Sequence, residues 1–195
     1  CDTVKERRTQ LAQIFPDCRF FRRYDDMLDE HGIELVLVAT RSMDHVDHVI
    51  AALERGLRVA VESPVAVRFD DAKRLRGAAM KCEKNVFPIQ RGLFAPEYLL
   101  ARKAMAGGIL GSLHHVTVRY SDYVRRNDWQ ATKASGGGAV YYAMPDIALQ
   151  SMSLLGEKPI QMWSELMRIS TSGDAEDYFY LRLRTAARVV ANAEF

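Results

Sequence analysis

One stretch of the chain places groups that can move protons on a helix with a glycine-rich entry. Residues 136–156 read GGGAVYYAMPDIALQSMSLLG, in which three glycines precede an apolar helical pattern that closes with Leu-Leu-Gly. Tyr141, Tyr142 and Asp146 lie between these ends. A tyrosine hydroxyl can donate a proton, and a carboxyl group can do so where its surroundings keep it protonated. The stretch is therefore a candidate for acid–base chemistry.

The same residues also have a purely structural interpretation. Pro145 lacks an N–H and is best tolerated in the first turn of a helix, so a helix is expected to begin there. Asp146 directly after it is then a helix-start carboxylate that the helix dipole favours. The two tyrosines can pack with one face wet. Both interpretations remain open at the level of sequence.

The first half of the chain alternates strand-like runs with helical patterns. Residues 33–40, IELVLVAT, are continuously apolar, which predicts a strand buried on both faces of a parallel sheet. Asp44 is expected to cap the next helix, 45–55, which Gly56 ends. This βαβ rhythm predicts a doubly wound α/β unit. The other elements expected here are helices 3–15 and 69–84, a short strand and then a short helix within 18–32, and strands 57–63 and 85–90.

The second half has a different order. Its last three elements are strands that follow one another, which predicts an open, mostly antiparallel sheet with helices on one face. We therefore expect two domains, residues 1–90 and 91–195, with the boundary near residues 88–96. The expected elements are helices 97–106 and 139–155, and strands 112–124, 159–170, 177–185 and 187–195.

Open α/β sheets bind ligands at the carboxyl ends of their strands. Ala39-Thr40 and Glu62-Ser63-Pro64 follow two such strands, and Cys1-Asp2 opens the chain in the same way. Asp2 fits the acidic residue that bonds a ribose hydroxyl in dinucleotide folds, if a strand and glycine turn precede it. It fits equally well as the N-cap of helix 3–15. No G-x-G-x-x-G occurs in the 195 residues, so no pyrophosphate cradle is shown.

Composition excludes several classes of partner. The net charge is +2 and the arginine pairs are isolated, so we expect no nucleic-acid partner. No apolar run reaches the length of a membrane span, and no secretory signal opens the chain. Three scattered cysteines favour a reducing, cytoplasmic setting. Asp44, His45 and His48 share a helix turn that is better explained as surface than as a metal site, so no metal is predicted. A start at Cys1 without Met leads us to expect truncation at both ends.

Several motifs in order resemble the Gfo/Idh/MocA oxidoreductases, named for glucose-fructose oxidoreductase, inositol dehydrogenase and a rhizopine-catabolism protein. The resemblance runs through LVLVAT, HVDHVIAALERGLRVAVESPVAV and DDAKRLRGAAMK. The family's EKP corresponds to Glu62-Ser63-Pro64, and its RFxP to Leu93-Phe94-Ala95-Pro96. MAGGILGSLHHVTV, Trp129 and the three glycines 136–138 match further family positions.

This resemblance implies a Rossmann domain, incomplete here, followed by an α+β domain with an open, mostly antiparallel sheet. It implies NAD or NADP as cofactor and a sugar, cyclitol or related small molecule as substrate. It also implies a homodimer or homotetramer formed through the C-terminal sheet. The residues it places around the cofactor are Thr40, His45, Glu62 and Pro64 on the nicotinamide side, and Asp2 on the ribose.

The chain departs from the family pattern on both sides of the implied cleft. Ser63 stands where the family has its catalytic lysine, and it has neither the charge nor the reach of an ammonium group. In the family's D-x-x-x-H motif, Tyr142 replaces the aspartate and Asp146 the histidine that serves as acid–base. Leu149 replaces the aspartate that follows, and Met144 a glycine.

Two hypotheses follow from these departures. In the first, the chain is an oxidoreductase with a rebuilt or impaired site, in which Tyr142, Asp146 and Ser63 are the candidate catalytic residues. In the second, it is a catalytically inactive relative that serves as a regulatory or nucleotide-sensing dimeric protein. A plain sugar-binding module has only Trp129 in its favour, and a single tryptophan is more often core than a stacking platform.

Overall fold

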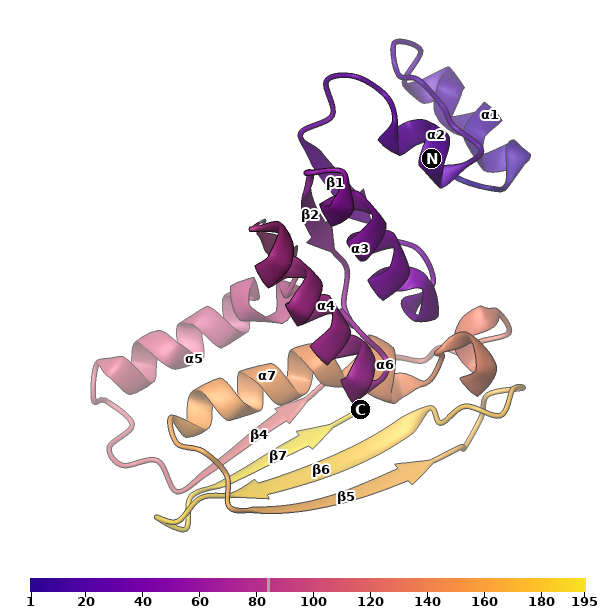
Figure 1. Ribbon diagram of the computed structural model, residues 1–195. Coiled ribbons are helices and arrows are strands. Elements are labelled where there is room, and N and C mark those ends of the chain that lie inside the picture. Colours follow the sequence, from indigo (N-terminus) through magenta and orange to yellow (C-terminus); the bar gives the residue numbers. More distant parts are fainter. Residues whose placement is uncertain (84) are drawn as a thin grey trace.

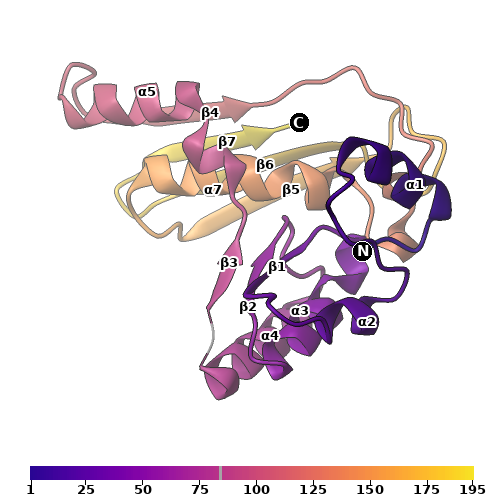
Figure 2. The same cartoon turned by 90° about the horizontal axis from the view of Figure 1, so that it is seen from above.

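Two separate sheets organise the chain, each with its own helices (Figure 1). The computed structural model describes residues 1–83 and 85–195. The first sheet has the strand order β1-β2-β3 and the second the order β4-β7-β6-β5. Figure 2 shows the segment that carries β3 running from the first unit to the second. The predicted division at residues 90 and 91 falls within this connection and stays a prediction.

The N-terminal sheet is parallel throughout, as the βαβ rhythm predicts. It consists of β1 (Leu35–Val38), β2 (Arg58–Val61) and β3 (Val86–Pro88), and Val38 pairs with Val61 in the register. Helices α3 (His45–Glu54) and α4 (Phe69–Cys82) pack against each other over one face. The core between sheet and helices is aliphatic: Val36, Val38, Val46, Val49, Ala52, Leu53, Val59, Val61 and Leu75, together with Leu28.

The prediction that β1 is buried on both faces is wrong for the described residues. Val36 and Val38 are buried, but Leu35 and Leu37 are 54% and 59% exposed. A strand that is apolar at every position is expected to have other elements packed against both of its faces. Within residues 1–83 and 85–195, α3 and α4 cover the face of Val36, and no element packs over the face of Leu35.

The segment before β1 differs from the prediction at two points. It contains α1 (Lys5–Ile14) and α2 (Tyr24–Leu28), as expected, but residues 18–23 form no strand. A strand needs a hydrogen-bonded neighbouring strand, and among the described backbone bonds of residues 18–23 the only one to a segment distant in sequence joins Asp2 N to Phe21 O. Asp44 stands at the N-cap of α3, but its carboxylate accepts from Arg41 Nε at 3.0 Å and makes no cap bond.

The C-terminal sheet is mixed and mostly antiparallel, as predicted. β5 (Gln161–Met167), β6 (Tyr178–Arg184) and β7 (Val190–Glu194) are antiparallel neighbours. β4 (His115–Arg119) pairs with β7 in parallel, although two helices and the strands β5 and β6 lie between them in the sequence. Four short 3-10 turns complete the described elements: η1 (Ser42–Asp44), η2 (Arg91–Phe94), η3 (Trp129–Ala131) and η4 (Lys133–Ser135).

Helices cover one face of this sheet and leave the other open (Figure 1). They are α5 (Pro96–Ala106), α6 (Ala139–Tyr142) and α7 (Met144–Leu155). The single helix predicted over 139–155 is broken at Ala143, and Pro145 lies in the first turn of α7, where it was expected. Phe179, Leu181 and Ile147 form the centre of the core under α7. None of the described helices is long and apolar enough to cross a bilayer.

Replacing Phe179 by alanine should lower the free energy of unfolding by about 3–5 kcal/mol, because its side chain is fully buried under α7. Urea unfolding followed by circular dichroism measures the loss. Phe69→Ala is the control, because Phe69 is 79% exposed and its loss should cost less than about 0.5 kcal/mol. Equal losses in the two variants would contradict this assignment of the core.

Candidate functional site

The loops that follow β1 and β2 meet at a buried histidine. His45 Nδ1 lies 2.8 Å from the carbonyl oxygen of Pro64, and Nε2 lies 3.0 Å from that of Thr40. His45 is 2% exposed, and Pro64 is also buried. The structure thus brings together three of the residues predicted to surround a cofactor. It also shows that the His45 ring faces the protein interior, so any effect of His45 on a cofactor is indirect.

Thr40 and Glu62 are two of the polar side chains that this edge presents to solvent. Thr40 is exposed, and its Oγ1 lies 3.1 Å from His48 Nδ1. Glu62 is half-buried and continues the β-ladder, because its N–H donates to Val38 O at 3.0 Å. Its carboxylate makes no hydrogen bond or ion pair with any described residue. Both groups stand at the carboxyl edge of the sheet, where such folds bind ligands.

Ser63 and Asp146 both bind the segment that joins the two sheets. Ser63 Oγ donates to Ile89 O at 3.1 Å, and Asp146 Oδ1 accepts from Gly92 N–H at 3.2 Å. On the next turn of α7, Gln150 Nε2 donates to Gly92 O at 2.5 Å. A Cβ at position 92 would lie 2.8 Å from Asp146 Cβ, so only glycine fits without displacing the helix. Both candidate catalytic groups are thus engaged with backbone of the linker.

The glycine entry to α6 packs against the loops of the first unit. Gly136 has φ +73°, and a Cβ there would lie 2.9 Å from Met43 Cγ and 3.2 Å from Val67 Cγ2. The position therefore needs glycine for its conformation and for its lack of a side chain. The close approach brings α6, which carries Tyr142, next to the loop that follows β1.

Tyr142 lies in a cluster of aromatic and charged side chains. Its ring meets Phe195 edge-on at 5.4 Å between centroids, and Arg126 Cζ lies 5.3 Å from the ring centroid. Burial raises the pKa of Tyr142, and Arg126 opposes this effect. The acidic groups Asp177, Asp122 and Glu176 add to the increase. The phenol therefore stays protonated at neutral pH, and it can donate a proton but cannot act as a base.

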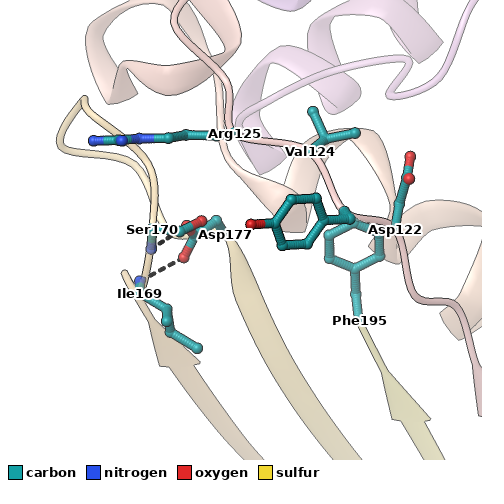
Figure 3. Close-up of a pocket in the computed structure, with 8 residues that line it drawn as sticks. Asp122, Val124, Arg125, Ile169, Ser170, Asp177 and Phe195 are labelled. Atoms are coloured by element: carbon teal, nitrogen blue, oxygen red, sulfur yellow. Dashed lines mark hydrogen bonds between the residues drawn. The ribbon is translucent and has the colours of Figure 1, made fainter.

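A hollow of about 420 Å³ opens beside this cluster (Figure 3). Asp177 forms part of its wall, and its side chain binds the backbone of the loop between β5 and β6. Its carboxylate accepts hydrogen bonds from the N–H groups of Ile169, Ser170 and Thr171 at 2.6–2.7 Å, and from Ser170 Oγ at 2.9 Å. Partial burial alone would raise the pKa of Asp177, but these bonds together hold it below its usual range. The hollow is lined by Asp122, Tyr123, Val124, Arg125, Ile169, Ser170, Asp177 and Phe195.

Asp2 lies in the N-terminal segment, where its side chain makes only local contacts among the described residues and its N–H donates to Phe21 O at 3.1 Å. Its Oδ1 accepts from Val4 N–H at 2.7 Å just before α1, and its Oδ2 lies 3.5 Å from Arg7. The N-cap of α1 is Val4 and not Asp2, so Asp2 supports the helix start from two residues before the cap. Its assignment to a ribose stays a prediction.

Sequence reasoning missed three residues of the site. Gln150 and Asp177 carry no motif, and their partners are revealed only by the fold. Arg126 forms an isolated pair with Arg125, which predicts solvated surface, yet its Nε is buried without a hydrogen-bond partner among the described residues. No group of three or more metal-binding side chains lies together in the described part of the chain.

The comparison with protein families covers both units. Residues 1–89 match the oxidoreductase family with an NAD-binding Rossmann fold, and residues 98–195 match the GFO/IDH/MocA C-terminal domain. The chain belongs to the GFO/IDH/MocA oxidoreductase family. The family resemblance, the fold and the family's cofactor class, NAD or NADP, are thereby confirmed.

The similar proteins share the fold of this chain and are longer than it. Scyllo-inositol 2-dehydrogenase (NADP(+)) of Bacillus subtilis is 24% identical over 92% of this chain and 51% of its own length. An NAD-binding protein of Listeria innocua superposes with TM-score 0.90 at 22% identity, over 100% of this chain and 55% of its own. Levoglucosan dehydrogenase, solved with NADH and levoglucosan, superposes with TM-score 0.83 at 20% identity, over 99% of this chain and 55% of its own. The chain spans about half the length of these relatives.

Asp177→Asn should destabilise the protein at pH 7, because an amide offers fewer acceptor sites to the four donors around it. A lowered pKa in the folded state contributes stability above the unfolded pKa of about 4, and this contribution is lost as the pH falls through the lower folded value. The difference between wild type and variant should therefore shrink below about pH 4. Urea unfolding from pH 7 to pH 3 measures it, and a constant difference would contradict the role of the ionised carboxylate.

Proposed function

We propose that this family member binds NAD or NADP and transfers a hydride to or from a sugar, cyclitol or related hydroxyl compound, with a site that is rebuilt or impaired relative to the family pattern. The observation that carries the proposal is the arrangement of residues at the carboxyl edge of the parallel sheet. There, two neighbouring loops are held together by His45 and present Thr40 and Glu62 outward. The substrate class is that of the relatives, whose names specify scyllo-inositol and levoglucosan.

The residues present fit the nicotinamide end of such a cofactor. A hydroxyl group at Thr40 and a carboxylate without a described partner at Glu62 are the donor and acceptor types that carboxamide and ribose groups need. The described sheet ends at β1 on this side, and the sequence contains no glycine-rich turn for the pyrophosphate. The cofactor itself supplies the hydride acceptor or donor.

Among the three candidate catalytic residues, Tyr142 is the best proton donor. Its hydroxyl stays protonated because of burial, and the guanidinium of Arg126 over its ring stabilises the negative charge that develops on donation. Ser63 and Asp146 act differently. Their hydrogen bonds to Ile89 and Gly92 hold the linker in place, so they orient the two units.

A second candidate function has a specific observation in its favour. The side chains at the family's lysine and histidine positions are both engaged with backbone, and neither supplies a free acid–base group. A relative that binds a nucleotide without turnover and acts as a regulatory or sensing dimer would keep the cofactor edge and lose these groups. Binding without catalysis distinguishes this function from the first.

We also propose a homo-oligomer formed through the open face of the C-terminal sheet, in a cytoplasmic setting. β5 is exposed along its whole length, and Trp163 is 54% exposed on that face, next to Tyr180. The register places Arg182 and Asn192 in line with Trp163. Within the described residues no helix covers this side, and an exposed aromatic group on a sheet of mixed charge is typical of an interface.

Full-length protein should bind NADH or NADPH, and titration followed by nicotinamide fluorescence measures the affinity. If cofactor binds, scyllo-inositol and levoglucosan are tested for turnover at the nicotinamide absorbance band. Tyr142→Phe should lower kcat by about 100-fold or more, because it removes the proton donor. Tyr120→Phe is the matched control, because Tyr120 also packs against Phe195, and it should stay within about twofold.

The outcomes of this experiment distinguish the two proposed functions and include one that rejects both. No binding of either nucleotide at millimolar concentration rejects both the enzyme and the sensor. Binding without turnover across a polyol panel supports the sensor. Turnover that Tyr142→Phe leaves unchanged removes Tyr142 from the mechanism but keeps the oxidoreductase.

Trp163→Glu should shift the full-length protein toward the monomer, because it removes the exposed aromatic side chain and places at the proposed interface a charge that association would have to desolvate. Light scattering after size-exclusion chromatography measures the mass. Phe69→Glu is the control, because Phe69 is exposed on α4, away from the sheet. An oligomer that withstands Trp163→Glu, or a wild-type monomer, would refute an assembly through this face.

A further inference from the structure

Thr40 is fixed from two points on one helix. His45 Nε2 lies 3.0 Å from its carbonyl oxygen, and His48 Nδ1 lies 3.1 Å from its hydroxyl. The two histidines are three residues apart on α3, so they project from the same side of the helix. His48 is itself held, because Tyr24 donates to its carbonyl at 2.8 Å and packs edge-on against its ring. Residues of α3 therefore contact both the backbone carbonyl and the side-chain hydroxyl of Thr40.

The His45 ring also reaches the neighbouring loop. Its Nδ1 lies 2.8 Å from Pro64 O, on the opposite side of the ring from Thr40 O. The ring is 2% exposed, so water cannot replace either contact. A carbonyl oxygen only accepts, so each contact is a hydrogen bond when the ring nitrogen facing it carries a proton: a neutral imidazole makes one of the two bonds and an imidazolium makes both.

The two carbonyls belong to loops that follow adjacent parallel strands. β1 ends at Val38 and β2 at Val61, and these two residues are partners in the register. The loops then carry Thr40 and Glu62 to the edge of the sheet. Loops are more mobile than the strands they follow, and a displacement of about 1 Å in a binding group can cost about a hundredfold in function. A buried bridge between the loops removes that freedom.

We propose that His45 is a positioning residue that joins the Thr40 and Pro64 loops into one rigid edge for the nicotinamide end of the cofactor. It acts through the two loop carbonyls and does not touch the cofactor. This role rests on the proposed binding of NAD or NADP. It replaces the direct contact that the family resemblance implied for His45.

The test compares two buried positions on the same helix in the full-length protein. His45→Leu fills the space but removes both polar contacts, and it should raise the dissociation constant of NADH or NADPH about tenfold or more. Val49→Ala removes buried apolar volume without reaching either loop, because Val49 is fully buried in the helix–sheet core. It should leave the dissociation constant within about twofold, although it also lowers stability. His45→Gln keeps an amide donor and should recover part of the affinity.

Urea unfolding of all three variants separates affinity from stability. If the dissociation constant follows the loss of stability equally in His45→Leu and Val49→Ala, His45 is merely structural and the proposal fails. The proposal also fails if His45→Leu binds within about twofold of wild type.

Hydrogen exchange tests the bridge without any cofactor. Amides in residues 39–44 and 62–67 should exchange about tenfold faster in His45→Leu than in wild type, whereas Val49→Ala should not single out these loops. Unchanged exchange overturns the bridge. A wild-type protein that shows the bridge by exchange but binds neither nucleotide refutes the proposed function and, with it, the role of the bridge in cofactor binding.

Discussion

The segment 89–92 is bound from both sides, and the relation between the two sheets depends on this contact. Ser63 holds Ile89 from the loop after β2, and Asp146 and Gln150 hold Gly92 from α7. The fit is close enough that position 92 has no room for a Cβ. Hydrogen bonds to otherwise buried backbone are costly to lose, so these three side chains set where α7 lies relative to the parallel sheet.

The same contact engages the two side chains at the positions where the resemblance predicts the family's lysine and histidine. Ser63 and Asp146 stand at these two predicted positions, and both bind the linker. Tyr142, the proposed proton donor, lies on α6, on the other side of the Ala143 break, and packs against Phe195. Its protonation is controlled mainly by burial and only secondarily by the nearby charges. Burial of the Tyr142 side chain is thus the main influence on its pKa.

The patterns that depend on neighbours along the chain were predicted well. The apolar runs identified β1 and β2, the helical periodicity identified α3 and α4, and Pro145 identified the start of α7. The failures concern groups whose partners are distant or absent among the described residues. Residues 18–23 have strand-like composition but no neighbouring strand, and Leu35 has no cover on its face. Asp44 is a suitable cap, but Arg41 competes for its carboxylate.

The sequence by itself determined the family and the order of the elements, and it predicted the positions at which the family's lysine, histidine and aspartates are replaced. These follow from motifs and periodicity that neighbouring residues define. Only the tertiary structure decided what the replacements do. Ser63 binds a carbonyl 26 residues away, and Asp146 binds an N–H 54 residues away. The direction of a polar side chain depends on which backbone groups the fold brings within about 3 Å of it, and no local pattern encodes that distance.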